Sequence, residues 1–287
     1  MSGAVPRAKL GLVLSGGAAR GWAHIGILQA LTAAGLRFDV VTGASIGAVA
    51  GAFYLAGKLD GLERDALEAK GLRLAGYADL QIRGAGLLGG QRILKRFRQH
   101  FGTMRVEDLP VPFASIGLDL VTGKERLLTR GPIAEVLRTS ISLPGIFEPI
   151  VTEDAVLIDG GLIQPVPVNA CRALGAERII AVDLLGDYAG VAQARQLRPG
   201  APIKSNPFQV LTTAFAVVMR ELGQVRQAGA PADLTLVPPI GHIQTHEFHR
   251  AEELIALGRA AAERALDGIQ AVADAASLQR RCTTSKA

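Results

Sequence analysis

The stretch FDVVTGASIGAVAGAFYLA, residues 38–56, decides the fold. Its apolar beginning, Phe38–Val41, predicts a short buried strand, and its alanine- and glycine-rich end predicts a helix that runs to Ala56. The residues between them, Thr42–Gly47, predict a tight turn. A strand, a tight turn and a helix in this order are typical of one unit of an α/β fold.

A second unit of the same kind precedes the first. Lys9–Leu14 is a short apolar run, and it ends in the glycine-rich loop Ser15–Gly21. Apolar residues then recur with helical spacing between Trp22 and Leu31. Two successive strand–helix units predict a parallel sheet.

The rest of the chain continues the alternation of strands and helices. Further strands are predicted at Ala155–Ile158, Arg178–Leu185 and Asp233–Val237, and helices at Pro132–Thr139, Val168–Leu174, Pro207–Gln227 and about Thr245–Gly268. Phe113–Leu120 and Glu125–Leu128 flank Thr122-Gly123 and predict a hairpin at the sheet edge. Gly57–Gly102 is predicted to form a cap or lid, and Gly186–Ser205 a loop.

We therefore expect an α/β fold with a largely parallel central sheet flanked by helices. No linker divides the chain, so residues 1–278 are predicted to form a single domain. Residues 279–287 are predicted to be a disordered tail.

The composition indicates a globular protein. Hydrophobic residues make up 49% of the 287 and charged residues 20%, which is enough apolar material for a sizeable core. The aromatic share of 5% and a net charge of only +5 do not favour nucleic acid as a partner. No run approaches the roughly 18 apolar residues of a membrane span, and two cysteines are too few for a disulfide framework. We expect a cytoplasmic protein that touches a membrane at most from its surface.

Basic residues concentrate between residues 70 and 98, where Asp79 is the one acid. They are Lys70, Arg73, Arg83, Arg92, Lys95, Arg96 and Arg98. Apolar side chains, among them Leu87, Ile93 and Phe97, lie between them. One interpretation is a contact with lipid headgroups or an anionic membrane, and the other is an ordinary solvated helix face.

Ser45 is the candidate nucleophile. Gly43-Ala44-Ser45-Ile46-Gly47 has the G-x-S-x-G form of a nucleophile elbow, in which a sharp turn presents a serine hydroxyl above the sheet. Gly43 and Gly47 suit this turn because larger side chains there would collide. The competing interpretation is a plain turn that happens to contain serine.

The loop after the first strand is the candidate oxyanion hole. Its residues Gly16, Gly17, Ala18 and Ala19 open a helix, so their backbone N–H groups converge where negative charge is favoured. Arg20 is expected to support the shape of this loop or to contact a phosphate headgroup. A plain turn and a phosphate cradle are the alternatives, but the Lys-Ser/Thr ending of a P-loop is absent.

The candidate base is Asp159 rather than a histidine. It ends the predicted buried strand Ala155–Ile158, and the glycines Gly160 and Gly161 that follow let another backbone segment approach. A structural aspartate that caps a turn is the alternative. His24 is expected to pack within a helix. His242, His246 and His249 have a spacing compatible with a metal, but a surface turn explains them better.

These sites, taken in order, resemble the patatin-like family of lipid acyl hydrolases. The segments that carry the resemblance are Gly16–Gly21, Gly43–Gly47 and Asp159–Gly161, joined by Trp22–Gly26 and Ser140–Pro149. The resemblance covers about Lys9 to Val182. Ala18 departs from it, because many members of the family have a third glycine there, and its N–H group is expected to survive if the local φ is negative.

The resemblance implies a Ser45–Asp159 dyad and an acyl-enzyme, with no metal or cofactor. Its implied substrates are acyl esters of phospholipids or lysophospholipids. A regulatory protein that binds lipid on the same fold without turning it over is the other class of function. The sequence does not distinguish between headgroups or acyl positions.

Overall fold

The structure is a computed structural model that describes residues 8–69, 86–195, 199–200, 207–229 and 231–278. Its strands are β1 (Leu10–Leu14), β2 (Val40–Gly43), β3 (Gly86–Leu88), β4 (Phe113–Asp119), β5 (Lys124–Leu128), β6 (Gly145–Phe147), β7 (Ile150–Val151), β8 (Val156–Asp159), β9 (Arg178–Val182) and β10 (Leu234–Leu236). Its α-helices are α1 (Ala23–Ala33), α2 (Ile46–Leu55), α3 (Leu59–Glu68), α4 (Gln91–Phe101), α5 (Ile133–Ser140), α6 (Val168–Ala173), α7 (Tyr188–Ala194), α8 (Pro207–Ala228), α9 (Ala251–Arg264) and α10 (Leu266–Leu278).

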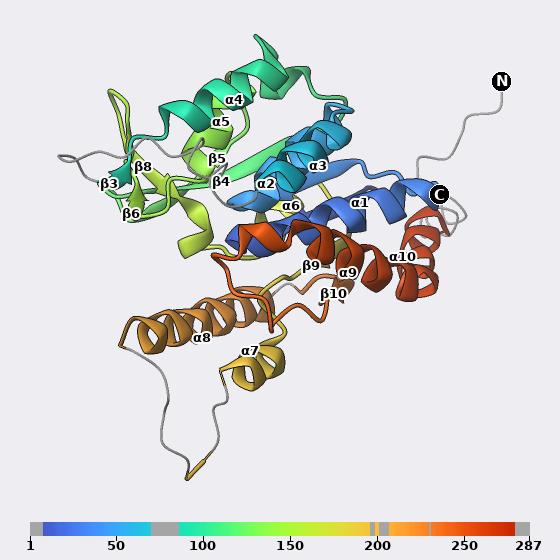
Figure 1. Cartoon of the computed structure of the whole chain (residues 1–287). Helices are drawn as coiled ribbons and strands as arrows, with labels where there is room; N and C mark the ends of the chain where they lie inside the picture. The colour runs from blue at the N-terminus through green and yellow to red at the C-terminus, as the bar shows by residue number, and fades with distance from the viewer. Residues whose placement is uncertain (1–7, 70–85, 196–198, 201–206, 230, 279–287) are drawn as a thin grey trace.

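The central sheet is largely parallel, as predicted. Its strand order is β10-β9-β1-β2-β4-β8-β7, with β5 added to β4 (Figure 1). The strands β10, β9, β1, β2 and β4 pair in this order as parallel neighbours. Strands β5 and β8 pair with β4 in the antiparallel direction, and β7 pairs with β8 in the same way. The pairing of β4 with β5 confirms the predicted hairpin.

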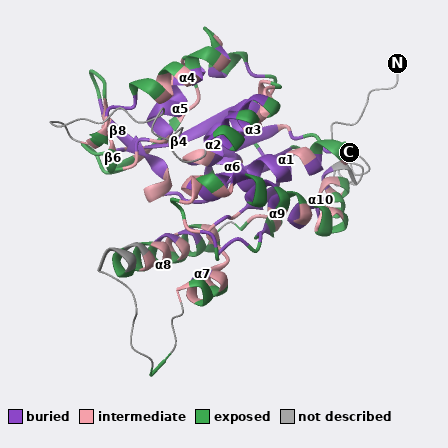
Figure 2. Ribbon diagram, in the orientation of Figure 1, coloured by how far each residue is buried: buried purple, intermediate pink, exposed green. Residues whose placement is uncertain are grey.

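Both faces of the sheet are covered, which explains why β1 is apolar throughout. Leu10, Leu12 and Leu14 belong to the large core that the sheet shares with α1, α2 and α9. Val13 points to the other face, where it packs with Val168 and other residues around α6. Figure 2 shows this burial as a continuous purple centre with exposed residues at the periphery.

The strands that carry Ser45 and Asp159 meet on one edge of β4. Ser115 of β4 pairs with Gly43 of β2 and also with β5, so β2 and β5 occupy opposite edges. Gly117 of β4 pairs with β5 and with Asp159 of β8, so β8 lies on the same edge as β2. Asp159 therefore lies about 7 Å further along β4 than Gly43, where the chain leaves β2 and turns into the elbow.

Three segments differ from their prediction or extend it. The loop predicted at Gly186–Ser205 contains the short helix α7. The last predicted helix begins later, at Ala251, and a second helix, α10, follows it after a break at Ala265. The predicted lid consists, in its described part, of α3, β3 and α4, and the apolar faces of α3 and α4 pack on the core.

Two predictions concern residues outside the described ranges: the disordered tail 279–287 and the basic residues Lys70, Arg73 and Arg83. In the described part of the chain, every helix is too short or too polar to cross a membrane.

Candidate functional site

Ser45 occupies the sharp turn between β2 and α2. Its φ of 54° and ψ of −128° are unusual for a residue with a side chain, so the turn holds the serine in a strained conformation. The flanking glycines are sterically required. A Cβ atom on Gly47 would lie 2.2 Å from the Leu14 carbonyl oxygen, and one on Gly43 would lie 2.4 Å from the amide nitrogen of Ala48.

Asp159 lies beside Ser45. The Ser45 hydroxyl donates a hydrogen bond to the Asp159 carboxylate. The Gly161 amide donates a second one to Asp159 Oδ1, at 2.8 Å. Gly160 lets β8 approach β4, because a Cβ atom there would lie 2.5 Å from the Ile116 carbonyl carbon. The structure thus places the predicted nucleophile and base in direct contact.

Burial changes the acidity of Asp159. Only 3% of this residue is exposed. Loss of solvent raises its pKa from 3.8 to about 6, although the hydrogen bonds from Ser45 and Gly161 act in the opposite direction. A carboxylate with this pKa is ionised at neutral pH and is a much stronger base than an exposed aspartate.

The glycine-rich loop lies against the elbow, but only part of it can donate to a ligand. A Cβ atom on Gly16 would lie 3.5 Å from Ser45 Cβ. The amide of Gly16 already donates to the Pro165 carbonyl at 3.0 Å, and that of Ala19 to the Thr245 carbonyl at 3.0 Å. The prediction of four donors is therefore wrong for Gly16 and Ala19.

Two amides of the loop keep free N–H groups. Those of Gly17 and Ala18 donate to no acceptor in the described part of the chain. Ala18 has a φ of 49°, so the negative φ under which its N–H group was expected to survive does not occur, although that N–H group is free all the same. The left-handed conformation costs an alanine about 1 kcal/mol relative to glycine.

Arg20 anchors the glycine-rich loop to the segment that contains Gly241 and Ile243. It is buried, and its Nε and Nη2 atoms donate to the carbonyls of Ile243 and Gly241 at 2.7 and 2.9 Å. Burial lowers its pKa to about 10, so it stays charged at neutral pH. These contacts support the predicted structural role and exclude the predicted headgroup role, because the guanidinium is already engaged inside the protein. Gly21 allows the loop to pack on Ile46, whose side chain would lie 2.1 Å from an added Cβ.

No histidine takes part in the Ser45–Asp159 contact. His24 is fully buried, and its Nε2–H donates to the Ser15 carbonyl at 2.9 Å. Burial lowers its pKa to about 4, so the ring is neutral. His242 lies 3.4 Å from Glu253, while His246 and His249 are exposed. Among the described residues, no group of three His, Cys, Asp or Glu side chains is placed to hold a metal.

Sequence reasoning missed the role of Arg138. This buried arginine of α5 donates to Ser142 Oγ at 2.6 Å and to the carbonyls of Gly89 and Glu148. The Ser142 carbonyl in turn accepts the amide of Asp159 at 3.0 Å. Arg138 therefore joins the cap segment, the 142–148 loop and the strand that carries Asp159. The resemblance at Ser140–Pro149 marked this region but begins two residues after Arg138.

In its described part, residues 86–98, the basic stretch does not form one continuous cationic surface. Arg96 is paired with Asp65, and Arg98 with Glu135 at 2.7 Å. Phe97 is buried, and Ile93 packs on the core. Helix α4 is in this respect an ordinary amphipathic helix, with Arg92 and Lys95 exposed.

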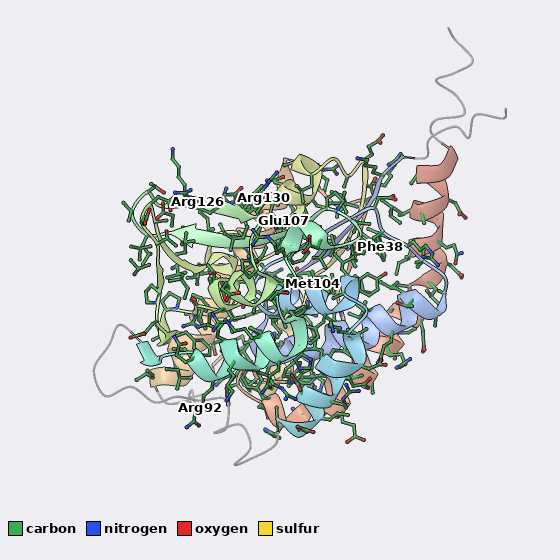
Figure 3. All side chains as sticks on the ribbon, turned by 90° about the horizontal axis from the view of Figure 1, so that it is seen from above. Phe38, Arg92, Met104, Glu107, Arg126 and Arg130 are labelled. Atoms are coloured by element: carbon green, nitrogen blue, oxygen red, sulfur yellow. The ribbon has the colours of Figure 1, made fainter. Side chains whose placement is uncertain are left out.

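A separate hollow of about 350 Å³ lies at the amino end of β4, next to Phe113, Glu107 and Arg130. Figure 3 shows Glu107 and Arg130 together on this side of the molecule. Ser45 follows the carboxyl end of β2, which runs parallel to β4, so the hollow is not part of the Ser45 site.

The comparison with protein families agrees with this geometry. Residues 12–172 match the model of a family described as patatin-like phospholipase. The chain belongs to the patatin-like phospholipase family. The matched residues include the loop, the elbow and the Asp159 segment.

Among its relatives, this patatin-like chain is 29% identical to an uncharacterised NTE family protein of Mycobacterium tuberculosis, with 91% of this chain and 92% of the relative covered. It is also 29% identical to the lysophospholipase NTE1 of Pyricularia oryzae, of which it spans 18%. Among solved structures, it resembles VipD from Legionella pneumophila with a TM-score of 0.51 and 14% identity, over 92% of this chain and 67% of that one. This last likeness shows the fold alone.

Proposed function

We propose that this patatin-like protein is a serine acyl hydrolase that cleaves ester bonds of phospholipids or lysophospholipids through Ser45 and Asp159. The observation that carries the proposal is the strained Ser45, whose hydroxyl donates to a buried carboxylate with a raised pKa. Strain, burial and a close partner are costly together, and such costs are typical of active sites. The family and the lysophospholipase among the relatives support a lipid substrate.

In the proposed mechanism, Asp159 takes the proton of Ser45 while Oγ attacks the ester carbonyl carbon. The carbonyl oxygen becomes an oxyanion, which the free N–H groups of Gly17 and Ala18 stabilise, at about 3 kcal/mol for each well-placed donor. Asp159 then gives its proton to the departing alcohol, which leaves an acyl group on Ser45. Asp159 next deprotonates a water molecule that releases the fatty acid and restores the serine. No step requires a metal or cofactor.

The lipid substrate implies a place of action. We propose that the protein works at the surface of lipid aggregates and contacts anionic membranes peripherally. A cytoplasmic location stays a prediction from composition.

The proposed function is tested by measuring fatty acid released from a lysophospholipid by wild type, Ser45→Ala and Asp159→Asn. Ser45→Ala should abolish release, and Asp159→Asn should lower it by a factor of about 100 or more, because the general base is lost. Asp154→Asn removes an exposed carboxylate five residues earlier and should change nothing. Wild-type protein that binds lipid but releases no fatty acid would instead indicate a lipid-sensing protein.

A further inference from the structure

Most of the large apolar side chains that face solvent in the described part of the chain gather in three places. The first is the pair of short strands β3 and β6, where Leu87 and Ile146 are neighbours and are 64% and 42% exposed. The second is the turn that follows β4 together with the end of β7. It exposes Leu120, Val121 and Val151. The third is the stretch of α8 from Val210 to Val218, which exposes Val210, Leu211, Phe215 and Val218.

The second place lies at the catalytic end of the sheet. β2 and β4 run parallel, and Ser45 follows the carboxyl end of β2. Leu120 and Val121 follow the carboxyl end of β4 directly, and Val151 is paired with β8 next to them. These side chains therefore project beyond the edge where the elbow lies.

The first and third places lie on the same side of the molecule. In Figure 1, α1 and α2 begin on the left, and β3, β6 and the Pro207 end of α8 also lie there. Leu211, Phe215 and Val218 are spaced four and three residues apart, so they form one stripe along α8.

The charges around these places favour a lipid surface that is partly anionic. Arg92 and Lys95 are exposed on α4, close after β3, and Arg92 points away from the body of the molecule (Figure 3). Glu153 and Asp154 are exposed at the turn between β7 and β8. Because both signs occur, apolar contact rather than charge should supply most of the binding energy.

We propose that these three places form one lipid-docking surface, which rests on a bilayer so that an ester can pass from it to Ser45. The proposal rests on the proposed function, because a water-insoluble substrate explains why apolar side chains surround the catalytic end. Leu87 and Leu211 are its central contacts. Val225 is 69% exposed on the same helix but lies about 21 Å from Leu211 along the helix axis, so it should stay out of the lipid.

The test is co-sedimentation with vesicles of mixed phosphatidylcholine and phosphatidylglycerol. The double variant Leu87→Ser/Leu211→Ser should bind on the order of tenfold more weakly than wild type or worse, since two partly inserted leucines are lost. Val225→Ser is the matched control and should bind as wild type does. All three proteins should hydrolyse a soluble short-chain ester equally, because neither leucine belongs to the catalytic machinery.

Equal vesicle binding by the double variant and wild type would overturn the proposal, and so would an equal loss of binding in Val225→Ser. A wild-type dimer that the double variant converts to a monomer, with unchanged vesicle binding, would assign the surface to a second copy of the chain instead. Absence of soluble-ester hydrolysis in wild type would contradict the proposed function alone, because vesicle binding is measured separately.

Discussion

At the scale of single residues, Asp159 carries a conflict between stability and the proposed chemistry. Its folded-state pKa of about 6 exceeds the ordinary 3.8, so the carboxyl group binds its proton more tightly in the folded chain. Ionisation therefore favours unfolding, and this loss of stability grows as the pH rises from about 4 to about 6. A shift of about two pKa units corresponds to roughly 3 kcal/mol.

Asp159→Asn should therefore increase the stability of the folded protein although it should remove most of the activity. We expect the free energy of unfolding at pH 8 to rise by up to about 3 kcal/mol, since a neutral amide replaces a desolvated charge. At pH 4 the change should be small, because the wild-type carboxyl group is then mostly protonated. Urea unfolding at the two pH values measures this, with the exposed Asp154→Asn as control. An unfolding free energy at pH 8 that falls would contradict the assigned pKa.

At the scale of elements, the glycine-rich loop is shaped by distant parts of the chain. Arg20 and the Ala19 amide both bond to carbonyls between Gly241 and Thr245. These bonds hold that segment in a non-helical path, which explains why α9 begins at Ala251 and not near Thr245 as predicted. Neither the spacing nor the composition of the loop could reveal this, because the partners lie more than two hundred residues away in sequence.

Arg20→Gln tests whether this anchoring matters to the reaction. We expect kcat for a soluble ester to fall at least about tenfold with little change in KM, because a displaced loop loses donors that act on the transition state. Arg259→Gln, which changes an exposed arginine of α9, is the control. A folded Arg20→Gln protein with the kcat of wild type would show that the loop keeps its shape without this anchor.

The sequence predicted the local parts of the site better than their arrangement. The G-x-S-x-G turn and the strand that ends at Asp159 follow from short-range patterns. Their contact depends on β8 joining the same edge of β4 as β2, and an antiparallel pairing of this kind leaves no periodic signal. The positive φ of Ala18 could not be predicted either, because alanine rarely adopts the left-handed backbone conformation and so does not indicate it.

At the scale of the whole molecule, α1 and α9 fix the position of the glycine-rich loop relative to the sheet. They approach so closely that a Cβ atom on Gly26 would lie 1.9 Å from the Ile255 carbonyl oxygen. A Cβ atom on Gly258 would lie 2.1 Å from that of Ala23. Helix α1 begins directly after the glycine-rich loop, so its contact with α9 helps to hold that loop in position beside Ser45.

Gly258→Ala should separate the two helices. We expect a loss of about 1 to 3 kcal/mol in the free energy of unfolding, as for other overpacked interiors, and a lower Tm. Gly223→Ala in α8 is the control, because its Cβ would meet Pro165 at an ordinary 3.4 Å. That variant should be neutral or slightly stabilising. Equal Tm values for both variants would show that α1 and α9 tolerate a wider spacing.

The dyad itself is tested most directly by the pH dependence of the rate at which a fluorophosphonate labels Ser45, followed by intact-protein mass spectrometry. In wild type the rate should rise with pH, with a midpoint near 6, and level off above it, because Asp159 must be ionised to accept the serine proton. In Asp159→Asn the labelling rate should be lower by a factor of about 100 or more, and its pH profile should lack that midpoint. His24→Gln should keep the wild-type profile. A midpoint near 6 that persists in Asp159→Asn, or disappears in His24→Gln, would show that a histidine and not Asp159 activates Ser45.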